Sequence, residues 1–276
     1  MGNRKVVLVT GCAKGGIGYE YCRVFAKKNC YVFATDISSR ICDMSSNNIE
    51  TLVLDVSSDE GVASAVDAIM SKRGRIDVLV NNAGIGNGGP LAELPLDAVR
   101  KSWEVNTLGP LRLVQQVVPH MVLCRRGTIV NVGSVVGRVP IPWAGNYCSS
   151  KAAVHAMSHI LRLELRPFGI NVVLVQPAAI TSNFVSDSLE KLVKRDWKLY
   201  KEFKEVMAEP GRASQSGKTS DAGVFARHVV EKVLSPRPPK EIIFGHMALL
   251  FFILSWCPLW LRDLLFSLRF GLNRRI

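Results

Sequence analysis

The sequence contains no C-x-x-C pair and an odd number of cysteines, seven in 276 residues. This pattern is typical of free thiols in a reducing compartment and argues against the disulfide framework of a small secreted protein. Zinc-finger spacing and arginine-rich tracts are also missing, although the formal net charge is +12. Because the basic residues are spread along the chain, we expect no nucleic-acid partner. Because the zinc-finger spacing is missing, we expect no metal site.

Uncharged apolar runs long enough to cross a membrane are missing as well. The chain passes from a basic start straight into a strand-like run, which predicts no secretory signal peptide. Residues 247–261 carry no charge, but these ~15 residues are fewer than the roughly 20 that a spanning helix needs, and Pro258 breaks the run. Trp256 and Trp260 are placed as interfacial anchors often are, and four arginines follow. We expect residues 246–276 to form an apolar, basic helical extension that docks on a membrane or lipid-droplet surface; the alternative is packing over a substrate pocket or a subunit interface.

Short apolar runs alternate with helix-like segments over most of the chain. The runs are enriched in β-branched residues and lie at 5–10, 31–36, 51–56, 76–81, 128–132 and 170–176. Helix-like segments lie at 20–28, 59–72, 97–124 and 147–165. Such alternation predicts an α/β fold in which a doubly wound parallel sheet of Rossmann type is covered on both faces. We expect residues 1–245 to form this single domain.

Residues 183–220 differ from this pattern. Residues 189–207 are rich in Lys and Glu, and Val193, Trp197, Tyr200 and Phe203 are spaced three or four apart, which predicts one amphipathic helix. It is either a surface helix or part of a substrate lid over 183–220. A loop is expected over 211–221.

A glycine-rich turn follows the first predicted strand, with the sequence TGCAKGGIG over residues 10–18. Glycines in such a turn let the backbone approach a pyrophosphate, and the helix that follows directs its N-terminus at the anion. Its position on the first strand of an alternating pattern predicts a dinucleotide site. The candidate binding residues are Gly11, Lys14, Gly16, Ile17 and Gly18.

Asp36 ends the second predicted strand, where an acidic residue accepts hydrogen bonds from the adenosine ribose. A carboxylate there repels a 2′-phosphate, which favours NAD(H). Lys14 favours NADP(H), because a cation in the turn could pair with that phosphate, and Arg40 is a second candidate. On balance Asp36 favours NAD(H), with NADP(H) a close alternative.

Tyr147 and Lys151 are four residues apart at the start of a predicted helix, so they lie on one face. A nearby ammonium favours the phenolate and lets Tyr147 exchange a proton with an alcohol or alkoxide. Ser134 follows a predicted strand, where its hydroxyl could hold a substrate oxygen as charge develops. Asn106 lies within a predicted helix, where an amide competes with backbone hydrogen bonds. These four residues are the candidate catalytic group.

In this order, these motifs resemble the short-chain dehydrogenase/reductase family over about residues 5–185. The further matching residues are Asp55 and the run Asn81, Asn82, Ala83 and Gly84. The resemblance implies that Tyr147 is the acid/base, that Ser134 polarises the substrate, and that Lys151 binds the ribose hydroxyls and tunes Tyr147. It implies that Asn106 holds a water of a proton relay.

The resemblance also implies further cofactor contacts. Asp55 and Val56 are expected at the adenine, and Asn82, Ala83 and Gly84 are expected to support the cofactor and the central sheet. Two departures are visible in the sequence. The glycine turn is one residue longer than usual, and the usual Pro-Gly after the sixth strand is Pro177 followed by Ala178. In that loop, Ser182 occupies the place of the usual Thr that contacts the nicotinamide carboxamide, and Thr181 is its neighbour.

The long glycine turn is similar to that of a subgroup, the 1-acyldihydroxyacetone-phosphate reductases and their plant and fungal relatives, which are lipid-associated and typically use NADPH. The resemblance implies, as the first candidate, a 1-acyldihydroxyacetone-phosphate reductase-like activity, in which a hydride passes between the nicotinamide and a lipophilic carbonyl or secondary alcohol. The substrate is expected near Ser134, Trp143 and Tyr147, and the expected location is the cytoplasmic face of the endoplasmic reticulum or a lipid droplet, otherwise the cytosol. An NAD-dependent alcohol dehydrogenase acting on a steroid or terpenoid is the alternative. A catalytically silent, membrane-associated cofactor-binding protein is a third reading.

Two expectations concern charge and assembly. A phosphorylated substrate would need cations, for which the candidates are Arg138, Lys191, Lys194 and Arg195. The resemblance makes a homo-oligomer possible through the helices that contain Asn106 and Tyr147.

No G-x-S-x-G motif occurs, so we expect no serine hydrolase activity.

Overall fold

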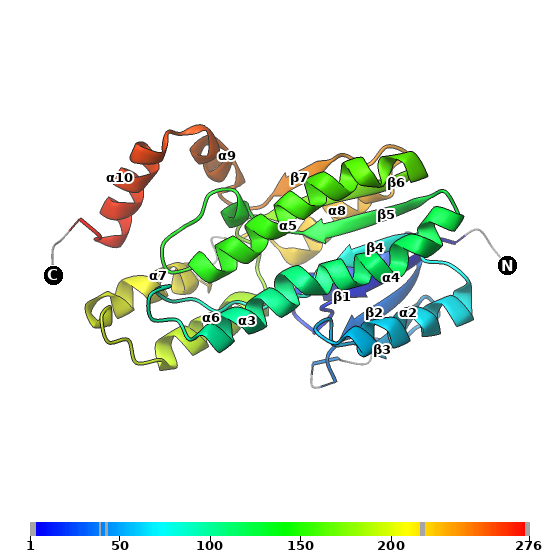
Figure 1. The fold of residues 1–276 in the computed structure, drawn as a ribbon, viewed down its shortest axis with the longest axis horizontal. Coiled ribbons are helices and arrows are strands. Elements are labelled where there is room, and N and C mark those ends of the chain that lie inside the picture. The colour runs from blue at the N-terminus through cyan, green and yellow to red at the C-terminus, as the bar shows by residue number, and fades with distance from the viewer. Residues whose placement is uncertain (1–3, 39, 42–43, 216–218, 274–276) are drawn as a thin grey trace.

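The computed structural model describes all residues except 1–3, 39, 42–43, 216–218 and 274–276. Seven parallel strands form one sheet in the order β3-β2-β1-β4-β5-β6-β7. In chain order the strands are Val6–Thr10, Tyr31–Asp36, Ile49–Val53, Val78–Asn81, Gly127–Val132, Ile170–Pro177 and Glu241–Phe244. Helices cover both faces (Figure 1). The predicted Rossmann-type, single-domain α/β fold is therefore confirmed.

Each face of the sheet has its own apolar core. On one face α1 (Ile17–Lys27) and α8 (Ala222–Val233) bury side chains such as Phe25 and Phe225. On the other face lie α2 (Asp59–Arg73), α4 (Gly109–Leu123) and α5 (Gly145–Glu164), with Leu113 and Ile69 in the core. The central strands are buried on both sides, which explains why their sequences read as continuous apolar runs.

Six of the seven strands were predicted, and β7 was not. β7 has only four residues, follows a proline-rich turn, and buries only Ile242. The sequence of so short an edge strand carries little apolar pattern, and β7 is stabilised by its pairing with β6.

The prediction of one helix over residues 189–207 was wrong. The chain forms α6 (Asn183–Lys194), a short 3-10 turn η4 (Lys201–Phe203) and α7 (Lys204–Gln215). The first residues of the loop expected at 211–221 are therefore helical, and residues 216–218 of that loop lie outside the described residues. Trp197, in the break after α6, is buried, and its indole N–H donates to the Leu192 carbonyl at 3.3 Å. The apolar spacing therefore reflects a third core, separate from those of the sheet. We call this segment the cap (residues 183–215); its core comprises Leu94, Leu192, Trp197, Phe203, Met207 and Ala208.

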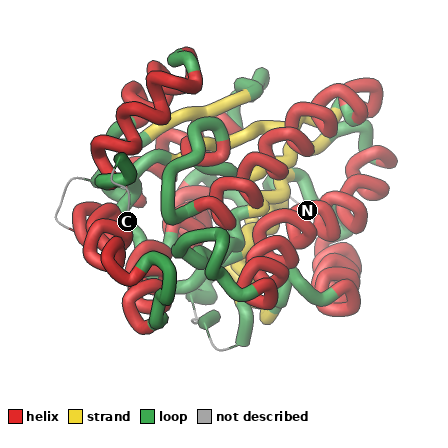
Figure 2. The backbone as a smooth tube through the Cα atoms, turned by 60° about the vertical axis from the view of Figure 1, so that its left-hand side comes forward, coloured by secondary structure: helices red, strands yellow, loops and turns green. Residues whose placement is uncertain are grey.

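The C-terminal extension consists of α9 (Ala248–Trp256) and α10 (Leu259–Phe270), separated at Cys257 and Pro258 as the sequence predicted. Both helices and the cap lie at the end of the molecule where the strands terminate and α5 begins (Figures 1 and 2). In the described part of the chain, no helix is long and apolar enough to cross a membrane.

Candidate active site

The site lies at the carboxyl ends of β1 and β4, where the strand order reverses direction. In open α/β sheets this switch point forms a crevice for ligands. Two glycines of the turn have positive φ, Gly11 at 73° and Gly15 at 80°. A Cβ at Gly11 would lie 2.7 Å from the Ala83 Cα, and one at Gly18 would lie 2.2 Å from the Gly11 carbonyl oxygen. Only glycine fits this turn against the end of β4.

The glycine turn leads into α1, whose first-turn N–H groups have no side-chain cap. Gly16 is the N-cap of α1 and provides no side-chain cap for the first-turn N–H groups. Uncapped N–H groups and the helix dipole favour an anion there. A pyrophosphate therefore fits the glycine turn, and Gly16, Ile17 and Gly18 supply the predicted backbone.

Asn82 and Ala83 join β4 to β1 beneath this turn. The Asn82 side-chain amide donates to the carbonyls of Thr10 (2.9 Å) and Gly11 (3.0 Å). The Thr10 hydroxyl accepts the backbone N–H groups of both Asn82 and Ala83 at 3.1 Å. These bonds fix the end of β4 against the glycine turn, while the support of a bound cofactor by Asn82 and Ala83 stays a prediction.

Asp36 lies at the end of β2, beside the turn. One carboxylate oxygen accepts the Ala13 N–H at 2.7 Å, and the other accepts the Ile37 N–H at 2.9 Å. Each oxygen has a second acceptor site, so the carboxylate can also bind hydroxyls. Asp36 thus also fixes the backbone of the glycine turn at Ala13.

The cations predicted to oppose Asp36 differ in their surroundings. Arg40 pairs with Asp187 of α6 at 2.8 Å, whereas Lys14 is exposed and its backbone carbonyl accepts the Asn183 side chain at 3.0 Å. Of the expected adenine contacts, Asp55 is exposed and accepts the Ser57 N–H, and Val56 is buried against Gly109.

Ser134, Tyr147 and Lys151 come together where β5 ends and α5 begins. Tyr147 retains partial solvent exposure, and Ser134 hydrogen-bonds its phenol. Burial among neighbouring atoms raises the pKa of Tyr147, while the Ser134 hydrogen bond acts in the opposite direction. Tyr147 is therefore a protonated phenol at neutral pH, the form that donates a proton.

Lys151 is buried, and its ammonium donates to the Val132 carbonyl at 2.8 Å and lies 5.8 Å from the Tyr147 ring centroid. Burial lowers the pKa of Lys151 to about 8. The side chain is still mostly charged at neutral pH, so its positive charge favours the phenolate of Tyr147.

Asn106 lies in a π-helical turn, η1 (Glu104–Leu108), between α3 (Leu96–Trp103) and α4. Such turns are frequent at functional sites. Its amide accepts the Ile85 N–H at 2.8 Å and donates to the Ile85 carbonyl at 3.0 Å and the Ser150 hydroxyl at 3.1 Å. A Cβ at Gly84 would lie 3.3 Å from Asn106 and 3.7 Å from Lys151. Gly84, Asn106 and Lys151 thus converge, and Asn106 holds the loop after β4.

The loop from β6 to α6 closes the other side of the site. The Pro177 carbonyl accepts the Ser134 hydroxyl at 3.5 Å, and the Thr181 and Thr219 hydroxyls lie 2.6 Å apart. Ser182 is the N-cap of α6. Asn183, which follows it, reaches across to the glycine turn.

Trp143 was predicted as a substrate residue, and its ring packs in the cap, 5.5 Å from the rings of Tyr200 and Phe203. The Phe184 ring of α6 lies 5.2 Å from the Tyr147 ring. Phe184 thus forms an apolar wall directly at the candidate acid/base, and the sequence reasoning missed it. A contact between Trp143 and substrate stays a prediction.

His155 was also missed. It lies one turn beyond Lys151 on the same face of α5, and its Nε2 accepts the Ser134 backbone N–H at 3.4 Å. A Cβ at Gly133 would lie 2.4 Å from this ring nitrogen, so the ring occupies the space beside that glycine. Burial and the positive charge of Lys151 lower the pKa of His155 to about 4, which keeps Nε2 an acceptor. The i+4 spacing from Lys151 was the available signal.

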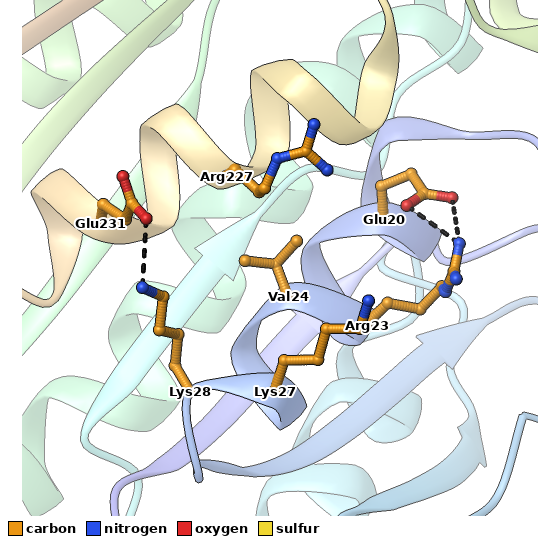
Figure 3. Close-up of a pocket in the computed structure, with 7 residues that line it drawn as sticks. All are labelled: Glu20, Arg23, Val24, Lys27, Lys28, Arg227 and Glu231. Carbon is orange, nitrogen blue, oxygen red and sulfur yellow. Dashed lines mark hydrogen bonds and ion pairs between the residues drawn. The ribbon is translucent and has the colours of Figure 1, made fainter.

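A cavity of about 190 Å³ lies elsewhere, between α1 and α8 (Figure 3). Its charged lining is largely paired internally, Arg23 with Glu20 and Lys28 with Glu231. None of the candidate catalytic residues lines it.

A glycine turn at the switch point and a Ser-Tyr-Lys group at the same edge define a nicotinamide-dependent oxidoreductase. A family model described as short chain dehydrogenase matches residues 5–192. The chain belongs to the short-chain dehydrogenase/reductase family and is an oxidoreductase acting on a CH–OH group or its carbonyl.

Relatives and solved structures agree with this assignment. The short-chain dehydrogenase ptmH of Penicillium ochrochloron is 33% identical over 269 residues, covering 95% of this chain and 96% of its own. The NADPH-dependent 1-acyldihydroxyacetone phosphate reductase of Saccharomyces cerevisiae is 27% identical over 281 residues, covering 98% and 93%. A short-chain dehydrogenase structure from Streptomyces avermitilis has a TM-score of 0.79 at 24% identity, covering 99% of this chain and 100% of its own.

Proposed function

We propose that this enzyme interconverts a lipophilic ketone and its secondary alcohol, with NAD(H) as the preferred cofactor. The observation that carries the proposal is the group formed by Ser134, Tyr147 and Lys151, with the apolar ring of Phe184 against the acid/base. All three chemical groups are retained, which argues against a catalytically silent protein.

A dinucleotide whose pyrophosphate lay at the glycine turn would supply or accept the hydride through its nicotinamide ring. The Tyr147 hydroxyl donates its proton to the oxygen of the developing alkoxide in reduction and accepts it back in oxidation. Ser134 donates a hydrogen bond to the same oxygen and stabilises its growing negative charge. The Lys151 ammonium lowers the cost of the Tyr147 phenolate and is positioned by the Val132 carbonyl.

NAD(H) is favoured because Asp36 presents a carboxylate at the end of β2 while Arg40 is paired with Asp187. A 2′-phosphate would meet the carboxylate and would have to displace that ion pair. Lys14 remains the cation that would support NADP(H).

An uncharged substrate is favoured over a 1-acyldihydroxyacetone phosphate. Arg138 pairs with Glu241 at 3.1 Å, Lys194 pairs with Glu190 at 2.5 Å, and Arg195 stacks on Trp197. Three of the four predicted phosphate ligands therefore already have partners. The acyl phosphate reductase activity is the second candidate, supported by the yeast relative, which is similar over nearly the whole chain.

We extend the proposal to location. The apolar C-terminal helices would hold the enzyme at the cytoplasmic surface of the endoplasmic reticulum or a lipid droplet. A lipophilic substrate is concentrated at such surfaces, which agrees with the apolar wall at Tyr147.

The decisive variant is Tyr147→Phe, assayed with NADH and a long-chain ketone. We expect the turnover rate to fall by about 10³-fold, because proton transfer loses its donor while the ring packing is kept. NADH binding, read by nicotinamide fluorescence, should change less than about twofold. Turnover at the wild-type rate would remove Tyr147 from the mechanism.

A further inference from the structure

The two C-terminal helices expose many large apolar side chains. We call this surface the α9–α10 face; its exposed apolar side chains are Leu249, Leu250, Phe252, Ile253, Trp256, Leu259, Trp260, Leu264, Leu265 and Leu268. Trp256 and Trp260 are 78% and 67% exposed, whereas indole rings are mostly covered in folded proteins. Patches of this kind mark sites of interaction.

The two helices are attached to two different parts of the molecule that flank the candidate site, the turn after Ser134 and the cap. α9 packs against η2 (Val135–Gly137), the turn that directly follows Ser134. At the end of α10, Phe270 is buried, and Leu272 packs on the core of the cap. Arg269 forms a bidentate pair with Glu209 of α7, with N–O distances of 2.8 and 3.0 Å. The face therefore bridges the serine turn and the cap.

The chemistry of the face matches a lipid surface. The run from Met247 to Leu261 is uncharged, and the sequence that follows holds four arginines, Arg262, Arg269, Arg274 and Arg275, against a single acid, Asp263. Arg269 is paired with Glu209, and Arg274 and Arg275 lie outside the described residues, so their contribution to the positive charge is argued from the sequence alone. An apolar helix face with tryptophans and flanking arginines is typical of segments that lie in the interface of an anionic membrane. The helices of nine and 12 residues are about 14 and 18 Å long, too short to span a hydrocarbon core of about 30 Å.

We propose that the α9–α10 face binds the surface of an anionic phospholipid bilayer and holds the serine turn and the cap against it, so that a membrane-dissolved ketone reaches Tyr147 directly from the bilayer. The orientation follows from the attachments, since a bilayer bound to the face lies beside both the serine turn and the cap. This access route rests on the proposed function, whereas the docking does not.

The test compares full-length wild type with the double variant Trp256→Ser/Trp260→Ser. Sedimentation with phosphatidylcholine vesicles containing phosphatidylserine should show about 30-fold weaker binding for the variant, because two exposed indoles are lost from the interface. The matched control is Leu123→Ser, which removes a side chain 84% exposed at the end of α4. The C-terminal end of α4 lies at the opposite end of the molecule from α9 and α10 (Figure 1). The control should bind like wild type.

Activity separates docking from access. We expect the double variant to reduce a short-chain, water-soluble ketone at the wild-type rate and a long-chain ketone dissolved in the vesicles about tenfold more slowly. Equal vesicle binding by wild type and double variant, or equal loss in the control, overturns docking. Lost binding with an unchanged long-chain rate overturns the access route.

Two further outcomes are distinguishable. A change in oligomeric state of the double variant, measured by light scattering without vesicles, would make the face an interface between copies of this chain and overturn lipid docking. No turnover of either ketone by wild type would overturn the proposed function and the access route with it, while sedimentation still decides docking.

Discussion

In β1 all five residues are buried, whereas in α9 only Leu254 is buried among nine residues. Both segments are strongly apolar in sequence. β1 lies between β2 and β4 and is covered by helices on both faces, while α9 has one side against η2. Hydrophobicity alone therefore does not distinguish core from surface; the number of neighbouring elements decides which apolar segments are buried.

The largest effect is expected in the sheet domain, for Gly18→Ala. Alanine is the better helix former, so propensity alone would stabilise α1 by up to about 1 kcal/mol. The new Cβ would lie 2.2 Å from the Gly11 carbonyl oxygen, within backbone that cannot move freely. We expect the free energy of unfolding to fall by about 3 kcal/mol or more. Urea denaturation measures it, and a gain in stability would show that the turn is loosely packed.

A smaller effect is expected for acidification, through His155. Its pKa in the folded protein is about 4, below its ordinary value near 6.5. The unfolded chain therefore binds more protons between these values, so stability is lost as the pH falls from 6.5 toward 4. Between pH 7 and 5 the loss should be about 2 kcal/mol.

The matched variant for this prediction is His155→Gln, which keeps a hydrogen-bond acceptor but does not titrate. Its stability difference between pH 7 and 5 should be smaller than that of wild type by the His155 contribution. An equal pH dependence in both proteins would assign the acid sensitivity to other groups.

A change of about 1.4 kcal/mol in binding, or tenfold, is expected for Asp36→Asn. Loss of the negative charge removes the repulsion of a 2′-phosphate and weakens hydrogen bonds to ribose hydroxyls. The ratio of the NADPH to NADH dissociation constants should fall at least tenfold, as measured by nicotinamide fluorescence. An unchanged ratio would show that Asp36 does not select the cofactor and serves only to bind the Ala13 N–H.

The smallest effect separates the two regions most clearly. Leu249→Ser removes an apolar side chain that is 71% exposed on the α9–α10 face. We expect the free energy of unfolding in the absence of lipid to change by less than about 0.5 kcal/mol, as for other surface substitutions. A loss of 2 kcal/mol or more would mean that this face is covered in solution.

The sequence predicted the elements whose signal is local. The alternation of β1 to β6 with α1, α2 and α5 was correct, because each strand is a compact apolar run bounded by turn residues. The glycine turn and the Tyr147–Lys151 spacing could be located for the same reason. Contacts between residues that are distant in sequence could not be predicted. Phe184 and Asn183 meet the site only because α6 folds back over it, and residues 189–207 look like one helix although Trp197 is buried in a break.

The contact between Asn183 and the glycine turn has a kinetic consequence. The Asn183 side chain donates to the Lys14 carbonyl, and its backbone N–H lies 3.4 Å from the Gly15 carbonyl oxygen, so the start of α6 is seated on the turn where the pyrophosphate fits. A nucleotide held there would be retained until α6 lifts. We therefore expect nucleotide to bind before the ketone and to leave after the alcohol, with its departure slow enough to set the turnover rate.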